Sequence, residues 1–164
     1  MTQEAPSRHA FVAAIAARDI DAVVDSLAPD VVLHSAVAVS PFEGKDVVAD
    51  IYRSVLESFE ELRIVDEFQN GDTHAFWWEG RMDGRFVAGA DRVRTDADGK
   101  AREITVVGRP LSGVSTFVSA IGLRFGRRRR GPAVGWALRI IALPLPVLFS
   151  LLEPVTRWLA RGSR

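Results

Sequence analysis

The sequence predicts an α+β domain whose helices pack against one face of a curved antiparallel sheet, followed by a basic, apolar helical tail. Apolar residues recur at helical spacing in the N-terminal part, the period changes to two from Leu62 onward, and the charge balance changes sign near residue 126. The 164 residues, 48% of them hydrophobic, suffice for one domain with an appendage. Because the chain has no cysteine, disulfides, thiolate metal sites and a cysteine nucleophile are excluded.

Three helices are expected, two before the first strand and one after it. Phe11, Val12 and Ile15 stand at helical spacing, and Asp19 is suited to capping a second, short helix. A third helix is expected after Gly44, with one apolar face. That face would contain Val48, Ile51, Tyr52, Val55 and Phe59.

Five strands complete the pattern. A β-branched run over residues 31–37 predicts the first strand, and period-two alternation predicts four more, over residues 62–68, 73–82, 86–95 and 101–109. The last four are joined by short connections rich in Asn, Asp and Gly, which favour antiparallel hairpins. Helices followed by a meander of strands indicate helices packed on one face of the sheet.

Charge divides the chain into two parts. Residues 1–110 hold 20 acidic against 12 basic residues, whereas residues 111–164 hold one acid, Glu153, and nine arginines. The change coincides with the arginine run 127–130 and the apolar stretch after it. We therefore expect a domain over residues 1–126 and a basic, apolar helical tail over residues 127–164.

Six short segments follow one another in a suggestive order. They are 18–21 (RDID), 27–35 (LAPDVVLHS), 41–45 (PFEGK), 89–94 (GADRVR), 98–100 (DGK) and 103–110 (EITVVGRP). Over residues 8–124 the chain resembles the nuclear transport factor 2-like superfamily, and more closely its SnoaL-like and ketosteroid isomerase-like members. The resemblance implies a cone-shaped sheet wrapped around helices, with an apolar cavity open at one end.

Most of the superfamily's chemistry does not carry over to this sequence. The proton-shuttling carboxylate of the isomerases falls on Ser35, and their oxyanion-hole tyrosine falls on Phe11. The arginine of limonene epoxide hydrolases falls on Gly89. The resemblance leaves Asp91, which matches the isomerases' protonated aspartic acid and, by analogy, the acid–base aspartate of the SnoaL-like cyclases.

Asp91 is the first candidate catalytic residue. Strand alternation places it on one face with Val87, Gly89 and Val93, opposite Arg92 and Arg94. An inward carboxyl among apolar neighbours tends to keep its proton or to find a donor. Asp91 is therefore either an acid that hydrogen-bonds a bound carbonyl group or a structural carboxylate paired with a buried donor.

His34 is the second candidate, because its side chain suits proton transfer near neutral pH. Alternation does not decide whether His34 or its neighbours Leu33 and Ser35 face the pocket. A satisfied structural or surface histidine is the alternative interpretation. His9 and His74 are expected to be solvated, and the carboxylates and histidines show no metal-ligand spacing, so we expect no metal and no cofactor.

Aromatic and aliphatic side chains are expected to line the pocket. Because Glu79 and Arg81 should face water, their neighbours on the strand should face inward. The candidate ligand-binding residues are Phe11, Ser35, Tyr52, Phe59, Phe76, Trp78, Met82, Ile104 and Val106. Glycines on the inner face, at Gly80, Gly89 and Gly108, should leave open space; the alternative is that side chains fill the core completely.

We therefore expect a domain that binds a small hydrophobic ligand, of the carbonyl, polyketide or steroid type. As an enzyme it would perform isomerase, cyclase or hydrolase chemistry, with Asp91 as acid and His34, if inward, as base. As a binding or interaction module, the same residues would only orient the ligand. Motifs for nucleotides, phosphates or a serine nucleophile are missing from the sequence.

Two partners are expected besides the ligand. A homodimer would use the outer face of the sheet, through Trp77, Val107 and Thr105. The tail would contact an anionic membrane surface, because residues 133–152 carry a single charge, Arg139, and a polar stripe follows in the helix. That stripe consists of Ser150, Glu153, Arg157 and Arg161.

The alternative is a tail that folds onto the domain or onto a second subunit. Pro144, Pro146, Pro154 and Arg139 argue against a simple membrane span. The acidic first part opposes nucleic-acid binding by the arginine run. Because the N-terminal residues are polar, we expect a cytoplasmic location. The tail's expected contact with lipid would place the protein at the inner face of the cell membrane.

Overall fold

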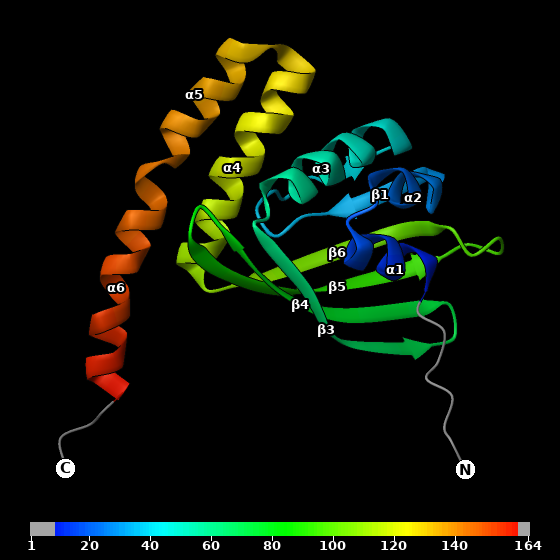
Figure 1. Ribbon diagram of the computed structural model, residues 1–164, viewed down its shortest axis with the longest axis horizontal. Helices are drawn as coiled ribbons and strands as arrows, with labels where there is room; N and C mark the ends of the chain where they lie inside the picture. The colour runs from blue at the N-terminus through cyan, green and yellow to red at the C-terminus, as the bar shows by residue number, and fades with distance from the viewer. Residues whose placement is uncertain (1–8, 161–164) are drawn as a thin grey trace.

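The computed structural model describes residues 9–160, apart from the side chains of residues 152, 153, 155–157, 159 and 160. Three helices precede most of the sheet: α1 (Ala10–Ala17), α2 (Ile20–Asp25) and α3 (Lys45–Ser58). Figure 1 shows them together on one side of the sheet. As expected, Asp19 caps α2, since its carboxylate accepts the backbone N–H groups of Asp21 and Ala22.

The sheet contains β1 (Leu27–His34), β2 (Phe42–Glu43), β3 (Glu61–Asn70), β4 (Thr73–Met82), β5 (Arg85–Thr95) and β6 (Ala101–Arg109). Its order is β2-β1-β6-β5-β4-β3, with β1 parallel to β6 and every other neighbouring pair antiparallel. The predicted α+β class with helices on a curved antiparallel sheet is confirmed.

The first strand begins and ends earlier than residues 31–37. Its beginning includes Pro29, which is tolerated because β2 pairs only with Val32 and Leu33 and leaves the start of β1 as an edge. Its end follows from Ser35, whose hydroxyl oxygen accepts the backbone N–H groups of Val37 (3.2 Å) and Ala38 (3.1 Å). This local turn competes with continued strand pairing.

Three helices follow the sheet: α4 (Leu111–Arg130), α5 (Pro132–Ala142) and α6 (Pro144–Ala160). The sequence did not predict α4, because its buried face carries small and hydroxyl side chains instead of an apolar stripe. These hydroxyls bond to carbonyl groups of their own helix, as Ser115 and Thr116 do to Ser112. The helix continues without a break past residue 126, where the domain boundary was expected; that boundary stays a prediction.

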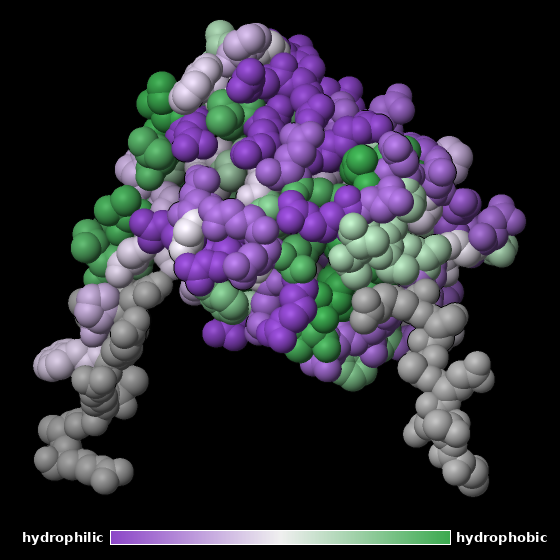
Figure 2. Space-filling view, viewed as in Figure 1, coloured by the Kyte–Doolittle hydropathy of each residue, from purple (hydrophilic) through white to green (hydrophobic). Residues whose placement is uncertain are grey.

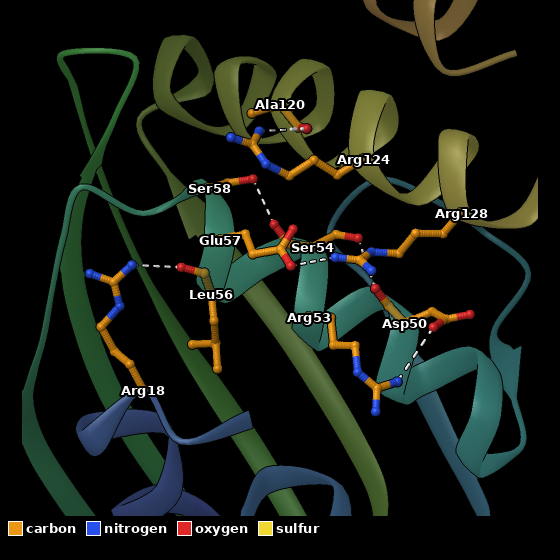
Figure 3. A network of polar contacts seen from close by, with 10 residues as sticks. All are labelled: Arg18, Asp50, Arg53, Ser54, Leu56, Glu57, Ser58, Ala120, Arg124 and Arg128. Atoms are coloured by element: carbon orange, nitrogen blue, oxygen red, sulfur yellow. Dashed lines mark hydrogen bonds and ion pairs between the residues drawn. The ribbon is translucent and has the colours of Figure 1, made fainter. Parts of the chain in front are cut away.

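Ion pairs hold the end of α4 to α3, as Figure 3 shows for Arg128 and Glu57. The neighbouring Arg129 pairs with Asp50 of α3 at 2.9 Å. The C-terminal end of α3, which carries Glu57, is also held by Arg18, whose guanidinium donates to the carbonyl oxygens of Leu56 (2.7 Å) and Phe59 (2.6 Å). The third helix is thus fixed at its middle and at its C-terminal end.

The core lies between the inner face of the sheet and α1–α3, and it includes a histidine expected to be solvated. His74 is only 6% exposed, and its ring centroid lies 4.2 Å from that of His9. The prediction was wrong because the strand alternation that buries Phe76 also turns His74 inward. Burial, together with the nearby His9, lowers the pKa of His74 below its ordinary value.

The outer face of the sheet carries the residues expected to form a dimer contact. Trp77 and Val107 are both aligned with Ala90 of β5, and Val107 is exposed. Thr105 lies two residues before Val107 on the same face. The homodimer stays a prediction.

Candidate functional site

A narrow apolar cavity lies between the inner face of the sheet, α1, α3 and α4. The cavity volume, counted as the space open to the centre of a water-sized sphere, is about 60 Å³, far below the roughly 300–1,000 Å³ of pockets for drug-sized ligands. The open space expected on the inner face of the sheet is therefore mostly filled by side chains. The lining residues are Ile15, Leu33, Ser35, Ala36, Ile51, Tyr52, Val55, Phe59, Leu62, Phe76, Trp78, Asp91, Val106 and Phe117.

Three aromatic rings occupy much of the space. Trp78 of β4 stacks on Phe117 of α4 with ring centroids 6.4 Å apart, and Phe59 contacts both rings edge-on. The glycines expected to leave open space serve these rings instead. A Cβ on Gly89 would lie 2.4 Å from the Trp78 ring, and one on Gly80 would lie 2.5 Å from the Phe59 ring.

Asp91 is the ionisable carboxyl group of this lining. It lies in the middle of β5, between Phe76 of β4 and Val106 of β6, and is 5% exposed. Its Oδ1 accepts a hydrogen bond from Nε1 of Trp78 at 2.7 Å. The structure thus turns Asp91 inward, as strand alternation predicted, and supplies one buried donor.

Burial raises the pKa of Asp91 from its ordinary value of 3.8 to about 7. The indole hydrogen bond of Trp78, followed by the nearby hydroxyl of Tyr52, acts in the opposite direction, because both groups favour the charged carboxylate. Since burial has the larger effect, Asp91 exchanges its proton near neutral pH. A carboxyl group with such a pKa is able to act as acid or as base.

Tyr52 of α3 brings a second polar atom to the cavity. Its side chain is 4% exposed, and burial, followed by the nearby Asp91 charge, raises its pKa well above 10.0. The hydroxyl is close enough to Asp91 for the two groups to affect each other, yet it makes no hydrogen bond of ordinary geometry within the described chain. It is therefore a buried donor available to a ligand oxygen.

Six of the nine predicted ligand-binding residues line the cavity, together with the catalytic candidate Asp91: Ser35, Tyr52, Phe59, Phe76, Trp78 and Val106. Three others, Phe11, Met82 and Ile104, are fully buried in the core but lie behind the lining. Phe11 packs edge-on against Tyr52, with ring centroids 5.3 Å apart. It therefore supports the lining without contacting the empty space.

His34 does not lie in the cavity. It faces the opposite side of the sheet, in a surface cleft shared with Asp30, Arg94 and Glu103. Leu33 and Ser35 take the inward positions, so alternation along β1 necessarily turns His34 outward. The suggested pairing of Asp91 as acid with His34 as base is therefore corrected.

Sequence reasoning missed several lining residues, of which Phe117 matters most. It is the part of α4 that reaches the cavity, and no signal was available because α4 itself was not predicted. The missed aliphatic residues Ile51 and Val55 belong to the apolar face predicted for α3. Within residues 9–160, no group of three or more carboxylate or imidazole side chains is placed to hold a metal ion.

A curved sheet that encloses an apolar cavity with one inward aspartic acid defines the class of protein. The family model of the SnoaL-like domain matches residues 9–107, and the chain belongs to this family. No curated protein sequence matches the chain.

Solved structures agree with this assignment. A steroid delta-isomerase from Pseudomonas aeruginosa is 32% identical, with 72% of this chain and 85% of that chain covered and a TM-score of 0.62. A conserved bacterial protein with a cystatin-like fold from Silicibacter pomeroyi is 20% identical, with 79% and 96% covered and a TM-score of 0.67. An NTF2-like protein from Cytophaga hutchinsonii is 15% identical, with 67% and 96% covered and a TM-score of 0.50. The last two show the fold alone.

Proposed function

We propose that this domain binds a small apolar carbonyl compound in the cavity, with Asp91 and Tyr52 donating hydrogen bonds to its oxygen. The observation that carries the proposal is the pair of buried polar groups in an otherwise apolar lining. Trp78 occupies Oδ1 of Asp91, which leaves the other carboxyl oxygen to carry the proton. Two donors on one oxygen are a recognised way to stabilise negative charge on a carbonyl group.

Proton transfer follows from the same arrangement. Asp91 gives its proton to the carbonyl oxygen, and the resulting carboxylate takes a proton from the carbon next to the carbonyl. The products are an enol and a regenerated carboxylic acid, so one side chain serves as acid and base. A pKa of about 7 suits both directions of transfer. The resemblance to a steroid delta-isomerase and the SnoaL-like family supports a carbonyl ligand.

The volume of the cavity restricts the ligand. A cavity with about 60 Å³ open to the centre of a water-sized sphere admits only a small compound while the side chains stay in place. Phe117 is the lining side chain best placed to move, because it is partly buried and belongs to a helix outside the family match. A ligand of steroid size therefore requires Phe117 to turn away from Trp78.

Acetophenone, a small aromatic ketone, is a suitable probe for both ligand binding and proton transfer. Infrared spectroscopy should show its carbonyl stretch shifted to lower frequency by the wild-type protein and shifted less by Tyr52→Phe, which removes only the hydroxyl. Deuterium uptake by the acetophenone methyl group in D₂O, followed by NMR, tests proton transfer. Asp91→Asn keeps a donor but cannot release a proton, so uptake should stop while binding persists. An unshifted carbonyl stretch in the wild-type protein would sink the proposal.

A binding module without catalysis is a second candidate, favoured by one observation. Asp91 and Tyr52 are the titratable side chains of the described lining, and His34 supplies no second base there. Under this alternative the carbonyl stretch shifts but deuterium uptake matches that of Asp91→Asn. The two experiments together therefore separate the candidates.

A further inference from the structure

Residues 132–151 of α5 and α6, here called the arm, lie outside the family match. The arm runs beside α4 and then past the sheet (Figure 1). By length and composition it could cross a membrane as a helix, although proline and an arginine interrupt it. Only 17% of its most apolar 18-residue window is buried.

The polarity of the arm is the reverse of that expected for a surface helix in water. Its few polar side chains face the domain, where Arg85 donates to the Ser150 hydroxyl at 2.6 Å and Arg139 lies 3.9 Å from Asp83. Its large apolar side chains face outward. Those exposed by more than a third are Val134, Trp136, Leu138, Ile140, Ile141, Leu143, Val147, Leu148 and Leu151.

Figure 2 shows hydrophobic patches along the edge of the molecule where Figure 1 places α5 and the first part of α6. Ile140 is 66% exposed and Ile141 is 73% exposed. Leu148 (55% exposed) and Leu151 (65% exposed) extend the exposed apolar surface onto α6. Contiguous apolar patches of this kind on a protein surface mark a site of contact with another apolar phase.

The charges around the arm select the kind of partner. The arginine run lies at the turn between α4 and α5, and two of its members pair with acids of α3. Arg127 and Arg130 are exposed and have no acidic partner within the described residues. Positive side chains beside an exposed apolar face complement the headgroups and acyl chains of an anionic bilayer.

The contacts of the arm distinguish lying on a bilayer from crossing it. Close packing joins it to α4, since a Cβ on Gly126 would lie 3.0 Å from Gly135, and a Cβ on Gly135 would lie 2.5 Å from the Leu123 carbonyl oxygen. Crossing a bilayer would also break the contacts of Ser150 with Arg85 and of Arg139 with Asp83. With these contacts kept, only the outward face is available to lipid.

We propose that the arm attaches the domain to the surface of an anionic lipid bilayer, with Ile140, Ile141, Leu148 and Leu151 in the acyl region. Arg127 and Arg130 then lie at the headgroups. The domain remains in water, and the arm keeps its contacts with α4 and with the β4–β5 turn. This membrane attachment is separate from the cavity and from the proposed carbonyl ligand.

Flotation of the full chain with vesicles tests the proposal. We expect binding to vesicles of phosphatidylcholine mixed with phosphatidylglycerol, and at least tenfold weaker binding to phosphatidylcholine alone. Ile141→Glu should reduce binding to the mixed vesicles at least tenfold. Phe68→Glu is the matched control, because Phe68 is 67% exposed but lies on β3, away from the arm; it should bind as the wild type does.

A separate variant tests the contribution of the arginine charges to vesicle binding. Replacing Arg127 and Arg130 with glutamine should remove most of the preference for anionic vesicles, whereas Arg102→Gln, at the start of β6, should not. Light scattering tests the alternative that the arm is a dimer contact, because it measures the mass of the protein in solution. If the full chain is a dimer that Ile141→Glu converts to a monomer, and neither binds vesicles, the arm is a contact between two copies and the lipid proposal is wrong. It is also wrong if Ile141→Glu binds vesicles as strongly as the wild type.

Discussion

Nε1 of Trp78 and Oδ1 of Asp91 are 2.7 Å apart on neighbouring strands β4 and β5, and both side chains point into the same cavity. The indole group can only donate, so it fixes which oxygen of Asp91 accepts. The other oxygen is left to carry the proton and, in the proposed function, to donate it to a ligand oxygen. A tryptophan thus orients the acid without competing for its proton.

Removing this donor should raise the pKa of Asp91 above about 7, because the Trp78 hydrogen bond favours the carboxylate. In Trp78→Phe, a ¹³C NMR titration of the Asp91 carboxyl should therefore show a midpoint at higher pH than in the wild type. Trp77→Phe is the control, since Trp77 is on the outer face. An unchanged midpoint in Trp78→Phe would show that the hydrogen bond does not act on the charged form.

Asp91 should make the protein less stable as pH rises from about 4 to about 7. Its pKa is raised in the folded state, so over this range the folded state binds more protons than the unfolded state. The loss is at most about 1.4 kcal/mol per pH unit. His74 acts in the opposite sense, because its lowered pKa removes stability as pH falls below its ordinary value of 6.5.

Comparison with Asp91→Asn isolates the effect, since His74 is unchanged in the variant. Urea unfolding at a series of pH values gives the free energy of unfolding of each protein. The difference, wild type minus variant, should decrease steadily between pH 4 and 7 and level off above. A difference that is flat with pH would mean that Asp91 is ionised throughout.

Tyr52→Phe should stabilise the free protein while weakening ketone binding. The buried Tyr52 hydroxyl lies near Asp91 but makes no hydrogen bond of ordinary geometry in the described structure, and leaving such a group unpaired costs about 1–3 kcal/mol. Thermal unfolding should therefore give an equal or higher Tm, together with a lower affinity for acetophenone by isothermal titration calorimetry. A variant destabilised by more than about 1 kcal/mol would show that the hydroxyl has a partner.

Local sequence patterns were sufficient for the sheet and for the inward position of Asp91. Alternation along β4 and β5 placed Phe76, Trp78 and Asp91 on one face, because a half-buried strand must separate apolar from charged side chains. The same rule could not place His34, since Val32 and Leu33 are both apolar and leave the register of β1 undecided. Its pairing with β6, a long-range contact, decides it.

The size of the cavity and the role of α4 could not be predicted. Glycines on the inner face indicate missing side-chain volume at Gly80 and Gly89, but only the tertiary structure shows the rings of Phe59 and Trp78 that fill it. The buried face of α4 carries Ser115, Thr116 and Ser119, which give no hydrophobic period. Phe117 was therefore missing from the predicted lining.

Phe117→Ala should enlarge the cavity and admit a larger ketone. Phe117 stacks on Trp78 and contacts Phe59, so its removal opens the cavity on the side of α4. The cost in stability should be about 2–3 kcal/mol, below that of a fully buried phenylalanine because this ring is partly exposed. Affinity for 2-acetylnaphthalene should increase relative to acetophenone, as measured by calorimetry.

Phe125→Ala is the matched control, since Phe125 also belongs to α4 but packs on Phe42, outside the cavity. If both variants change the ratio of the two affinities equally, α4 acts on the cavity as a whole and Phe117 does not limit ligand size.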